Sequence, residues 1–294
     1  MNKKIFGYSN LIRDCVVKGS DTRQAATFVL TEDFWMSCAH MSSIRFIDKV
    51  NHSSKEAISN ALDILDAHGS TILHVVAKKN EPEAFIALLG KIDQSLFRRL
   101  LTQKDYLGKT PLHYLAQFGS LKSFTALTAK INLDTLRGAI IMQDILGETP
   151  LYVTISYQSP QVIKWLMDKL PEKTLRDLSS ITTHDGATLF YIAMEKKKYD
   201  TFFHLFEKIQ DEEYLSDVLY RVPNGIDKSS FFFETIDFLT QYVVDSKTDC
   251  SINKIQLLKK IRQTVQSRRD VTPYSLFRKN RIPQLDTMKK NIDE

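Results

Sequence analysis

Along the middle of the chain, apolar residues recur at the spacing of short amphipathic helices, with polar residues between them. Four segments open with a turn-forming sequence and continue with apolar residues three or four positions apart. That spacing places apolar side chains on one face of a helix. The segments begin at Asp66, Asp105, Asp144 and Thr183. The pattern predicts an all-α protein built from repeated pairs of helices.

These segments form a repeat with a constant period. Gly69, Gly108, Gly147 and Gly186 are 39 residues apart, and apolar residues keep the same register downstream of each glycine. Self-similarity at a fixed period of this length is the signature of a repeat architecture. Four repeats are therefore predicted, at residues 66–104, 105–143, 144–182 and 183–222.

Each repeat is expected to begin with a tight turn that leads into a helix. The glycine supplies a positive φ angle, and the threonine two residues later can cap the helix N-terminus. Proline then follows in two repeats, where the first helical position tolerates a missing N–H group. The first helices are expected to end near Lys79, Phe118, Tyr157 and Lys196, and the second helices to begin near Pro82, Leu121, Pro160 and Tyr199.

The segments Gly108–His113 and Gly147–Tyr152 resemble the helix-opening signature of ankyrin repeats. The resemblance covers Asp66 to about Ile209 and implies an ankyrin-repeat solenoid. Ankyrin repeats have about 33 residues, so each repeat of 39 residues is lengthened. The added residues are predicted to form one extra helical turn and a longer loop, within Ser95–Thr102, Thr135–Gln143 and Thr174–Thr183.

Helical caps are expected at both ends of the repeats. Residues 1–65 are predicted to form a degenerate N-terminal repeat that includes Phe34–Ala39, Phe46–Val50 and Ala57–Leu62. Residues 223–270 are predicted to contain two capping helices at Ser229–Val244 and Ser251–Arg268, because end repeats need a polar outer face. Residues 271–294 are expected to form a basic, flexible tail.

The ankyrin resemblance implies where a partner would bind. In that family the residues beside the turn glycine and at the end of the first helix face the partner. The proposed partner-binding residues are Tyr106, Leu107, Lys109, Phe118, Ile145, Leu146, Glu148 and Tyr157. Apolar side chains in exposed positions mark an interface. The alternative is that the lengthened loops fold over these side chains and bury them.

No catalytic or cofactor motif accompanies the repeats. His74 and His113 occupy the fourth position of the helix-opening segment, and the resemblance implies that they hydrogen-bond turn backbones. The sequence contains no glycine-rich phosphate loop and no zinc-type ligand pair. We therefore expect a non-enzymatic interaction protein with no cofactor and no metal. The alternative from another class is an enzyme that uses a cysteine outside the repeats, at Cys15, Cys38 or Cys250.

Charge is concentrated at the C-terminus. The net charge is +5, and residues 254–294 carry eleven Lys/Arg against four Asp/Glu, so the rest of the chain is at −2. A basic segment can contact acidic membranes or nucleic acid, and this partner class remains a less favoured alternative to a protein partner. We expect a cytoplasmic protein, because its three cysteines are widely separated and odd in number and no apolar stretch is long enough for a membrane span. We also expect a monomer. The composition and the lengthened repeats are also similar to ankyrin-repeat effectors that intracellular bacteria secrete into the host cytosol.

Overall fold

The computed structural model describes residues 42–209, 211–246 and 251–266. Within these ranges the chain consists of α-helices joined by loops, with no strand. The helices of the N-terminal half are α3 (Ser43–His52), α4 (Lys55–Leu62), α5 (Ile72–Lys78), α6 (Pro82–Lys91), α7 (Gln94–Thr102), α8 (Pro111–Phe118), α9 (Leu121–Lys130) and α10 (Leu133–Ile140). Those of the C-terminal half are α11 (Pro150–Tyr157), α12 (Pro160–Lys169), α13 (Glu172–Ser180), α14 (Leu189–Glu195), α15 (Tyr199–Lys208), α16 (Glu212–Leu219), α17 (Lys228–Ser246) and α18 (Ser251–Gln266). The prediction of an all-α protein is confirmed for the described residues.

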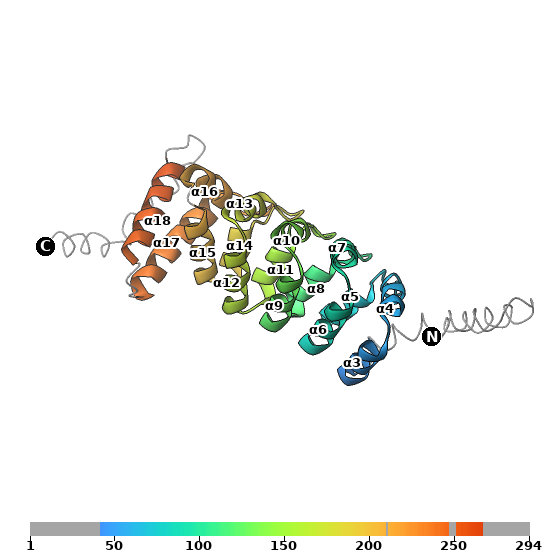
Figure 1. Ribbon diagram of the computed structural model, residues 1–294. Helices are drawn as coiled ribbons and strands as arrows, with labels where there is room; N and C mark the ends of the chain where they lie inside the picture. The colour runs from blue at the N-terminus through green and yellow to red at the C-terminus, as the bar shows by residue number, and fades with distance from the viewer. Residues whose placement is uncertain (1–41, 210, 247–250, 267–294) are drawn as a thin grey trace, which may run out of the picture. The chain divides into compact units, whose positions relative to one another are not determined.

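The chain divides into two compact units. The first comprises residues up to Ala139, and the second begins at Ile140, the last residue of α10. In the first unit α5 packs against α8, and α6 packs against both α3 and α9 (Figure 1). Large apolar side chains fill the space between these helices, with Phe46, Phe85 and Phe124 almost completely buried.

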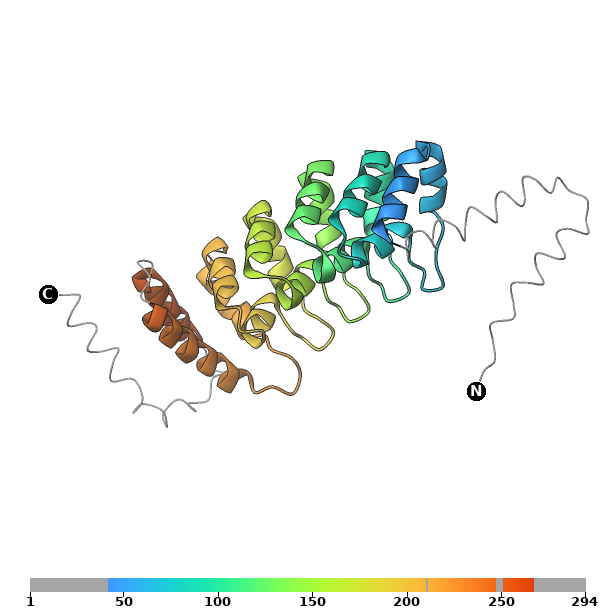
Figure 2. The same ribbon diagram turned by 90° about the horizontal axis from the view of Figure 1, so that it is seen from below.

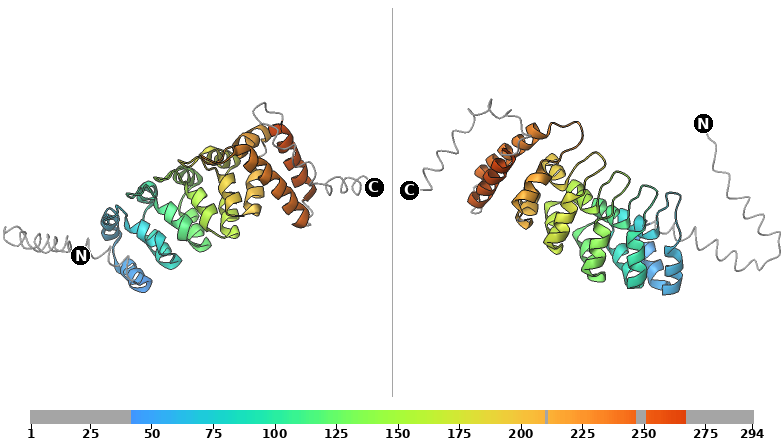
Figure 3. Two further views of the ribbon diagram at one scale, coloured as in Figure 1. Left: turned by 180° about the vertical axis from the view of Figure 1, so that it is seen from behind. Right: turned by 90° about the horizontal axis from the view of Figure 1, so that it is seen from above.

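The second unit repeats this packing and extends it. Helix α11 packs against α14, and α12 packs against α15. Helix α18 then contacts both α16 and α17, and α17 and α18 lie side by side in Figures 1 and 3. The buried core here is strongly aromatic, with Phe190, Phe202 and Phe206 each at most 2% exposed.

Helix boundaries reproduce the period of the sequence. The first helices of the four repeats begin at Ile72, Pro111, Pro150 and Leu189, and the second helices at Pro82, Leu121, Pro160 and Tyr199. Each set is spaced by 39 residues. Helices α3 and α4 begin 39 residues before α6 and α7, so Phe46–Val50 and Ala57–Leu62 are helical as expected. Residues 34–39 lie outside the described part of the chain.

Local chemistry explains why the first helices begin where they do. The hydroxyl groups of Thr149 and Thr188 accept hydrogen bonds from the backbone N–H groups of Tyr152 and Tyr191, three residues into each helix. These bonds satisfy N–H groups that have no partner within the helix. Proline at the first position of α8 and α11 also lacks the N–H group that would otherwise be left unpaired.

The lengthened part of each repeat differs from the prediction. The added residues form a third helix rather than a single turn and a longer loop, as α7, α10 and α13 show. In α7 the Asp93 side chain accepts from the N–H of Leu96 and starts the helix. Apolar residues at Phe97, Leu100 and Leu101 then lie on its buried face. Burial of that face accounts for a helix longer than the one expected.

The loops that lead from the third helix of one repeat into the next repeat project from one edge of each unit (Figure 2). In the first unit these are residues 63–71 and 103–110, and in the second unit residues 141–149, 181–188 and 220–227. They carry the turn glycines and most of the proposed partner-binding residues.

Among the described helices, none is long and apolar enough to cross a bilayer.

Candidate functional site

Hydrogen bonds within each loop hold the turn in a fixed shape. In the first repeat Asp66 Oδ1 accepts from the N–H groups of His68 and Ser70, both at 2.8 Å. Asp105 and Asp144 make the corresponding pairs of bonds in the next two repeats. Because the acceptor is a side chain within the turn, the residues at the tip can vary without loss of these bonds.

The fourth repeat reaches the same turn with a different residue. Thr183 stands where the other repeats have aspartate, and its hydroxyl accepts from the N–H of Ala187 at 2.9 Å. The same hydroxyl also donates to Asp185. The turn glycine still has a positive φ angle, at 97°. The turn therefore tolerates threonine at its first position.

Backbone hydrogen bonds join neighbouring turns within each compact unit. In the first unit the N–H of Tyr106 donates to the carbonyl oxygen of His68 at 3.0 Å. In the second unit His184 donates to Leu146 at 3.0 Å and Asn224 to Asp185 at 2.7 Å. Through these bonds, each of these turns is attached to the turn of the next repeat.

Close packing across the glycines reinforces the backbone link. A Cβ atom at Gly69 would lie 2.7 Å from Cδ1 of Tyr106, so the tyrosine ring rests directly on this glycine. In the second unit a Cβ atom at Gly147 would lie 2.8 Å from the backbone N of His184. At Gly147 a side chain is therefore excluded by backbone of the neighbouring turn, whereas at Gly69 it would require the Tyr106 ring to move.

The turns present most of the proposed partner-binding residues to solvent. In the first unit Tyr106 is 74% exposed and Leu107 49%, whereas Lys109 and Phe118 are half-buried. In the second unit Ile145 is 53% exposed, Leu146 57% and Tyr157 61%, and Glu148 is half-buried.

These exposures bear on the interpretation in which the lengthened loops bury the apolar residues. The alternative, in which lengthened loops cover them, is wrong for Tyr106, Leu107, Ile145, Leu146 and Tyr157, which are all exposed. The added residues are instead folded into the third helices. Phe118 differs from the other five because it is half-buried at the end of α8.

A groove lies beside the turns of the first unit. We call it the turn groove; it is lined by Asp66, His68, Ser70, His74, Val75, Lys78, Lys79, Asp105, Tyr106, Leu107 and Tyr114. Two of the proposed partner-binding residues, Tyr106 and Leu107, belong to it, and Lys109 and Phe118 do not. The structure therefore gathers part of the predicted set around a concavity and adds polar residues to it.

A buried hydrogen-bond network forms the floor of the turn groove. The hydroxyl of Tyr114 donates to Asp105 Oδ2 at 2.6 Å. Burial, together with this carboxylate, raises the pKa of Tyr114 above its usual value. The imidazole of His74 packs edge-on against the Tyr114 ring, with the ring centroids 6.0 Å apart. The network fixes the floor in one arrangement.

Tyr114 is a groove residue that the sequence did not reveal. The equivalent positions in the other repeats are Val75, Val153 and Ile192, so the position is one of buried aliphatic residues. The only available signal was Asp105, nine residues before Tyr114. The turn brings the Asp105 carboxylate within hydrogen-bonding distance of the Tyr114 hydroxyl.

His74 and His113 are structural, as predicted. His74 Nδ1 accepts from the N–H of Thr71 at 3.0 Å, while Nε2 lies 3.1 Å from the carbonyl oxygens of Gln103 and Lys109. This pattern requires a neutral ring that carries its proton on Nε2, and burial lowers the pKa of His74. His113 Nδ1 accepts from Thr110 in the same way at 3.0 Å.

Tyrosines and carboxylates occupy the corresponding surface of the second unit. Tyr152 replaces the histidine, and its pKa is raised by burial and by the nearby charges of Glu148, Glu195 and Asp185. The pKa of Tyr191 is raised as well, first by burial and then by Glu195 and Asp185. In this part of the second unit, carboxylates therefore lie close to partly buried tyrosines.

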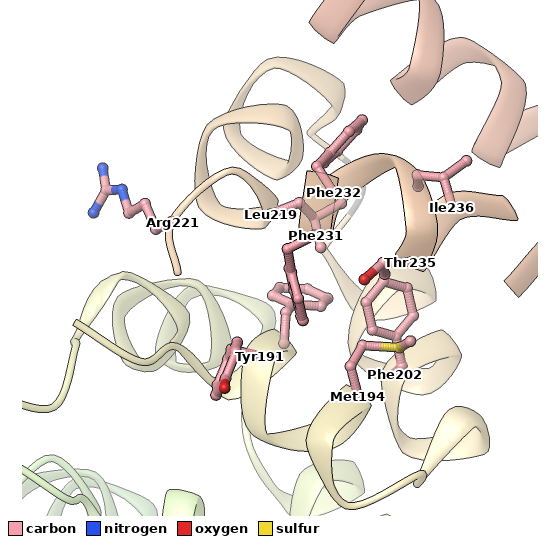
Figure 4. Close-up of a pocket in the computed structure, with 10 residues that line it drawn as sticks. Tyr191, Met194, Phe202, Leu219, Arg221, Phe231, Phe232, Thr235 and Ile236 are labelled. Carbon is pink, nitrogen blue, oxygen red and sulfur yellow. The ribbon is translucent and has the colours of Figure 1, made fainter. Parts of the chain in front are cut away.

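An apolar pocket lies between α14, α16 and α17 in the second unit (Figure 4). Half of its ten lining residues are aromatic, namely Phe190, Tyr191, Phe202, Phe231 and Phe232. The ring centroids of Tyr191 and Phe231 lie 5.2 Å apart. In Figure 4 the side chain of Arg221 points away from these rings. Its lining residues come from the last repeat and from α17, so these side chains pack α17 against that repeat.

A charged cluster lies on α12 and α15 of the second unit. Asp168 contacts Lys164 at 2.8 Å, His204 at 2.8 Å and Lys208 at 3.2 Å. The hydrogen bond from Lys164, with smaller contributions from Lys208 and His204, lowers the pKa of Asp168 to about 2. The contacts join α12 to α15 through charged side chains.

The described residues contain no cluster of metal ligands. None of their His, Cys, Asp and Glu side chains forms a group of three or more that could hold a metal ion. Cys15, Cys38 and Cys250, on which the enzyme alternative depends, lie outside the described ranges, and so does the predicted basic tail, residues 271–294. No protein-family model matches the chain, and a search of curated proteins finds no match.

Proposed function

We propose that this chain is a non-enzymatic recognition scaffold of the ankyrin-repeat type, which binds a partner protein through its turns and the ends of its first helices. The observation that carries the proposal is the exposure of large apolar side chains on hydrogen-bonded turns and at the end of α11. Tyr106 and Tyr157 are 74% and 61% exposed although the core beneath them is closely filled.

Rigid exposed side chains are well suited to binding. A tyrosine on a fixed backbone loses little conformational freedom on association. Burying such a side chain contributes on the order of 1.5–3 kcal/mol, and a few such residues carry most of the energy of a typical interface. Tyr106, Leu107, Ile145, Leu146 and Tyr157 supply these groups, and Lys109, Glu148 and Phe118 are proposed to complete the contact.

The test is an affinity capture from cell lysate, with the wild-type chain compared with a Tyr106→Ala/Tyr157→Ala variant. Circular dichroism first establishes that the variant is as helical as the wild type. The matched control is Ile44→Ala, because Ile44 is an apolar residue of α3 that is 80% exposed and lies away from the turns.

A protein captured by the wild type and the control, and lost from the tyrosine variant, is the expected result. Capture that persists in the tyrosine variant would place the binding surface elsewhere and overturn the proposal. Loss from both variants would show that general surface hydrophobicity, and not the turns, is responsible.

A further inference from the structure

We infer that Asn224 and Gly225 form a modification site at which the chain deamidates itself in the presence of water. The two residues lie at the tip of the loop 220–227, which we call the fifth turn. Deamidation replaces the side-chain amide of Asn224 by a carboxylate. This chemistry is separate from partner binding and does not depend on the proposed function.

Asparagine precedes glycine once in the sequence, at Asn224-Gly225. In such a pair the backbone nitrogen of the glycine can attack the side-chain carbonyl carbon of the asparagine. Glycine has no side chain to hinder that approach. The fifth turn projects from the second unit as the other turns do (Figure 2), so water reaches the pair.

Water is the only second reactant that the reaction needs. A bond forms between N of Gly225 and Cγ of Asn224, the bond from Cγ to the side-chain nitrogen breaks, and ammonia leaves with the proton of the glycine N–H. Water then opens the cyclic imide at either of its carbonyl carbons. One opening gives aspartate, and the other gives isoaspartate, in which the backbone runs through the former side chain.

The attacking nitrogen is unbonded in the fifth turn and hydrogen-bonded in the other four. In each repeat the N–H of the turn glycine donates to the carbonyl oxygen three residues earlier, as Gly69 does to Asp66 at 3.0 Å. In the fifth turn the closing bond is shifted by one residue, and Ile226 N donates to Pro223 O at 3.3 Å. Among the described residues Gly225 N has no acceptor, so its N–H is available for the reaction.

Proline accounts for this shift. In the second and fourth turns the N–H of the second turn residue, Tyr106 or His184, donates to the preceding turn. The equivalent residue of the fifth turn is Pro223, which has no N–H group. Asn224 makes the link instead and donates to the carbonyl oxygen of Asp185 at 2.7 Å.

The first residue of the turn removes a second set of constraints. In the four repeats an aspartate or threonine side chain accepts from backbone N–H groups of its own turn. Val222 occupies this position in the fifth turn, and its side chain has no hydrogen-bonding atom. The tip of the fifth turn is therefore held by fewer bonds than the tips of the other four.

Space around the pair permits the two reacting atoms to meet. Asn224 and Gly225 are both exposed, and nothing lies within 4 Å of a Cβ atom built on Gly225. Among the described residues the side-chain amide of Asn224 forms no hydrogen bond, so its Cγ is free to turn toward the nitrogen of Gly225.

The experiment is a mass-spectrometric time course of the full-length chain, incubated at mildly alkaline pH. Trypsin cleaves after Arg221 and Lys228, so the pair lies in a short peptide in which Asn224 is the only side-chain amide. The matched variant is His68→Asn, which places the same dipeptide at the equivalent position of the first turn, where Gly69 N–H is bonded. Both sites are then followed in one molecule.

We expect Asn224 to deamidate about fivefold faster than the asparagine introduced by His68→Asn, a ratio that corresponds to about 1 kcal/mol for one broken hydrogen bond. Equal rates at the two sites would overturn the inference. A capped peptide of residues 221–228 gives the rate of the unfolded sequence. Reaction of the folded chain at less than about a tenth of that rate, or about 1.4 kcal/mol of protection, would show that the fold shields the site and would also overturn the inference.

A second measurement uses the change in charge. Both products add a negative charge at the tip of the fifth turn, so ion-exchange chromatography should resolve a second form of the wild-type chain after incubation. Asn224→Ser removes the amide and should remove that form. The same second form in Asn224→Ser would place the reaction at another residue and refute the assignment.

Discussion

The packing of one turn on the next can be measured by adding a single carbon atom at Gly147. This glycine has a φ angle of 78°, and a Cβ atom there would lie 2.8 Å from the backbone N of His184 and 3.0 Å from Cα of Thr183. Both contacts are with backbone, which cannot rotate away as the end of a side chain can. Gly147→Ala should therefore destabilise the second unit.

The magnitude follows from two contributions. A residue with a side chain in the left-handed region costs about 1–2 kcal/mol. Relieving the contact with His184 N stretches or breaks its hydrogen bond to the carbonyl oxygen of Leu146, which is 3.0 Å long. The loss of one such bond costs about 1 kcal/mol. The expected decrease in the free energy of unfolding is about 2–3 kcal/mol.

Two other glycines serve as matched controls. Gly225 has a φ angle of 89° with nothing within 4 Å of an added Cβ, so Gly225→Ala measures the backbone strain alone. Gly90 lies within α6 in open space, and Gly90→Ala should stabilise that helix by about 0.5–1 kcal/mol.

The assay is urea denaturation of the wild type and the three variants, followed by circular dichroism. The order of stability should be Gly90→Ala above the wild type, then Gly225→Ala, then Gly147→Ala. Equal losses at Gly225 and Gly147 would show that the neighbouring turn yields without cost. That result would refute the conclusion that the backbone of one turn packs closely against the glycine of the preceding turn.

Three further predictions concern titrating and buried polar groups. The pKa of His74 is lowered in the folded state, so its contribution to stability is fully present above about pH 6.5 and is lost as the pH falls, by at most about 1.4 kcal/mol per pH unit. Denaturation at pH 7 and pH 5 should show a smaller decrease in stability for His74→Tyr than for the wild type, and equal decreases would contradict this. Tyr114→Phe should cost about 1–3 kcal/mol in urea denaturation, because Asp105 Oδ2 loses its donor inside the protein, and an unchanged midpoint would count against the network. NMR titration should give a pKa of about 2 for Asp168, and Lys164→Gln should raise it, since the Lys164 hydrogen bond is the largest cause of the shift; no change in that variant would show that the bond is absent in solution.

The period of the fold could be predicted because its determinants are local. Glycine in the turn, threonine at the helix N-terminus and proline after it each act within a few residues, and the helices begin where these signals place them. The third helices were underestimated because their length depends on burial against other helices, as Phe97, Leu100 and Leu101 of α7 show. Tertiary packing of this kind leaves a weaker trace in the sequence.

The candidate site was predicted only in part, for a related reason. The exposure of Tyr106 and Ile145 follows from their places beside a turn glycine, which the pattern identifies. The half-burial of Phe118 and the bond from Tyr114 to Asp105 depend on the packing around α8. A repeat pattern averages over positions, so it misses a residue that differs from its equivalents in the other repeats.

The links between the turns have a consequence for how such a surface can change over evolutionary time. The donors and acceptors that join Tyr106 to His68 and His184 to Leu146 are all backbone atoms. Substitutions at these positions therefore alter the chemistry displayed at the tip and leave the hydrogen bond between the tips in place. The side chains displayed at the tips can therefore change one residue at a time without loss of these hydrogen bonds, provided that the turn glycine is kept.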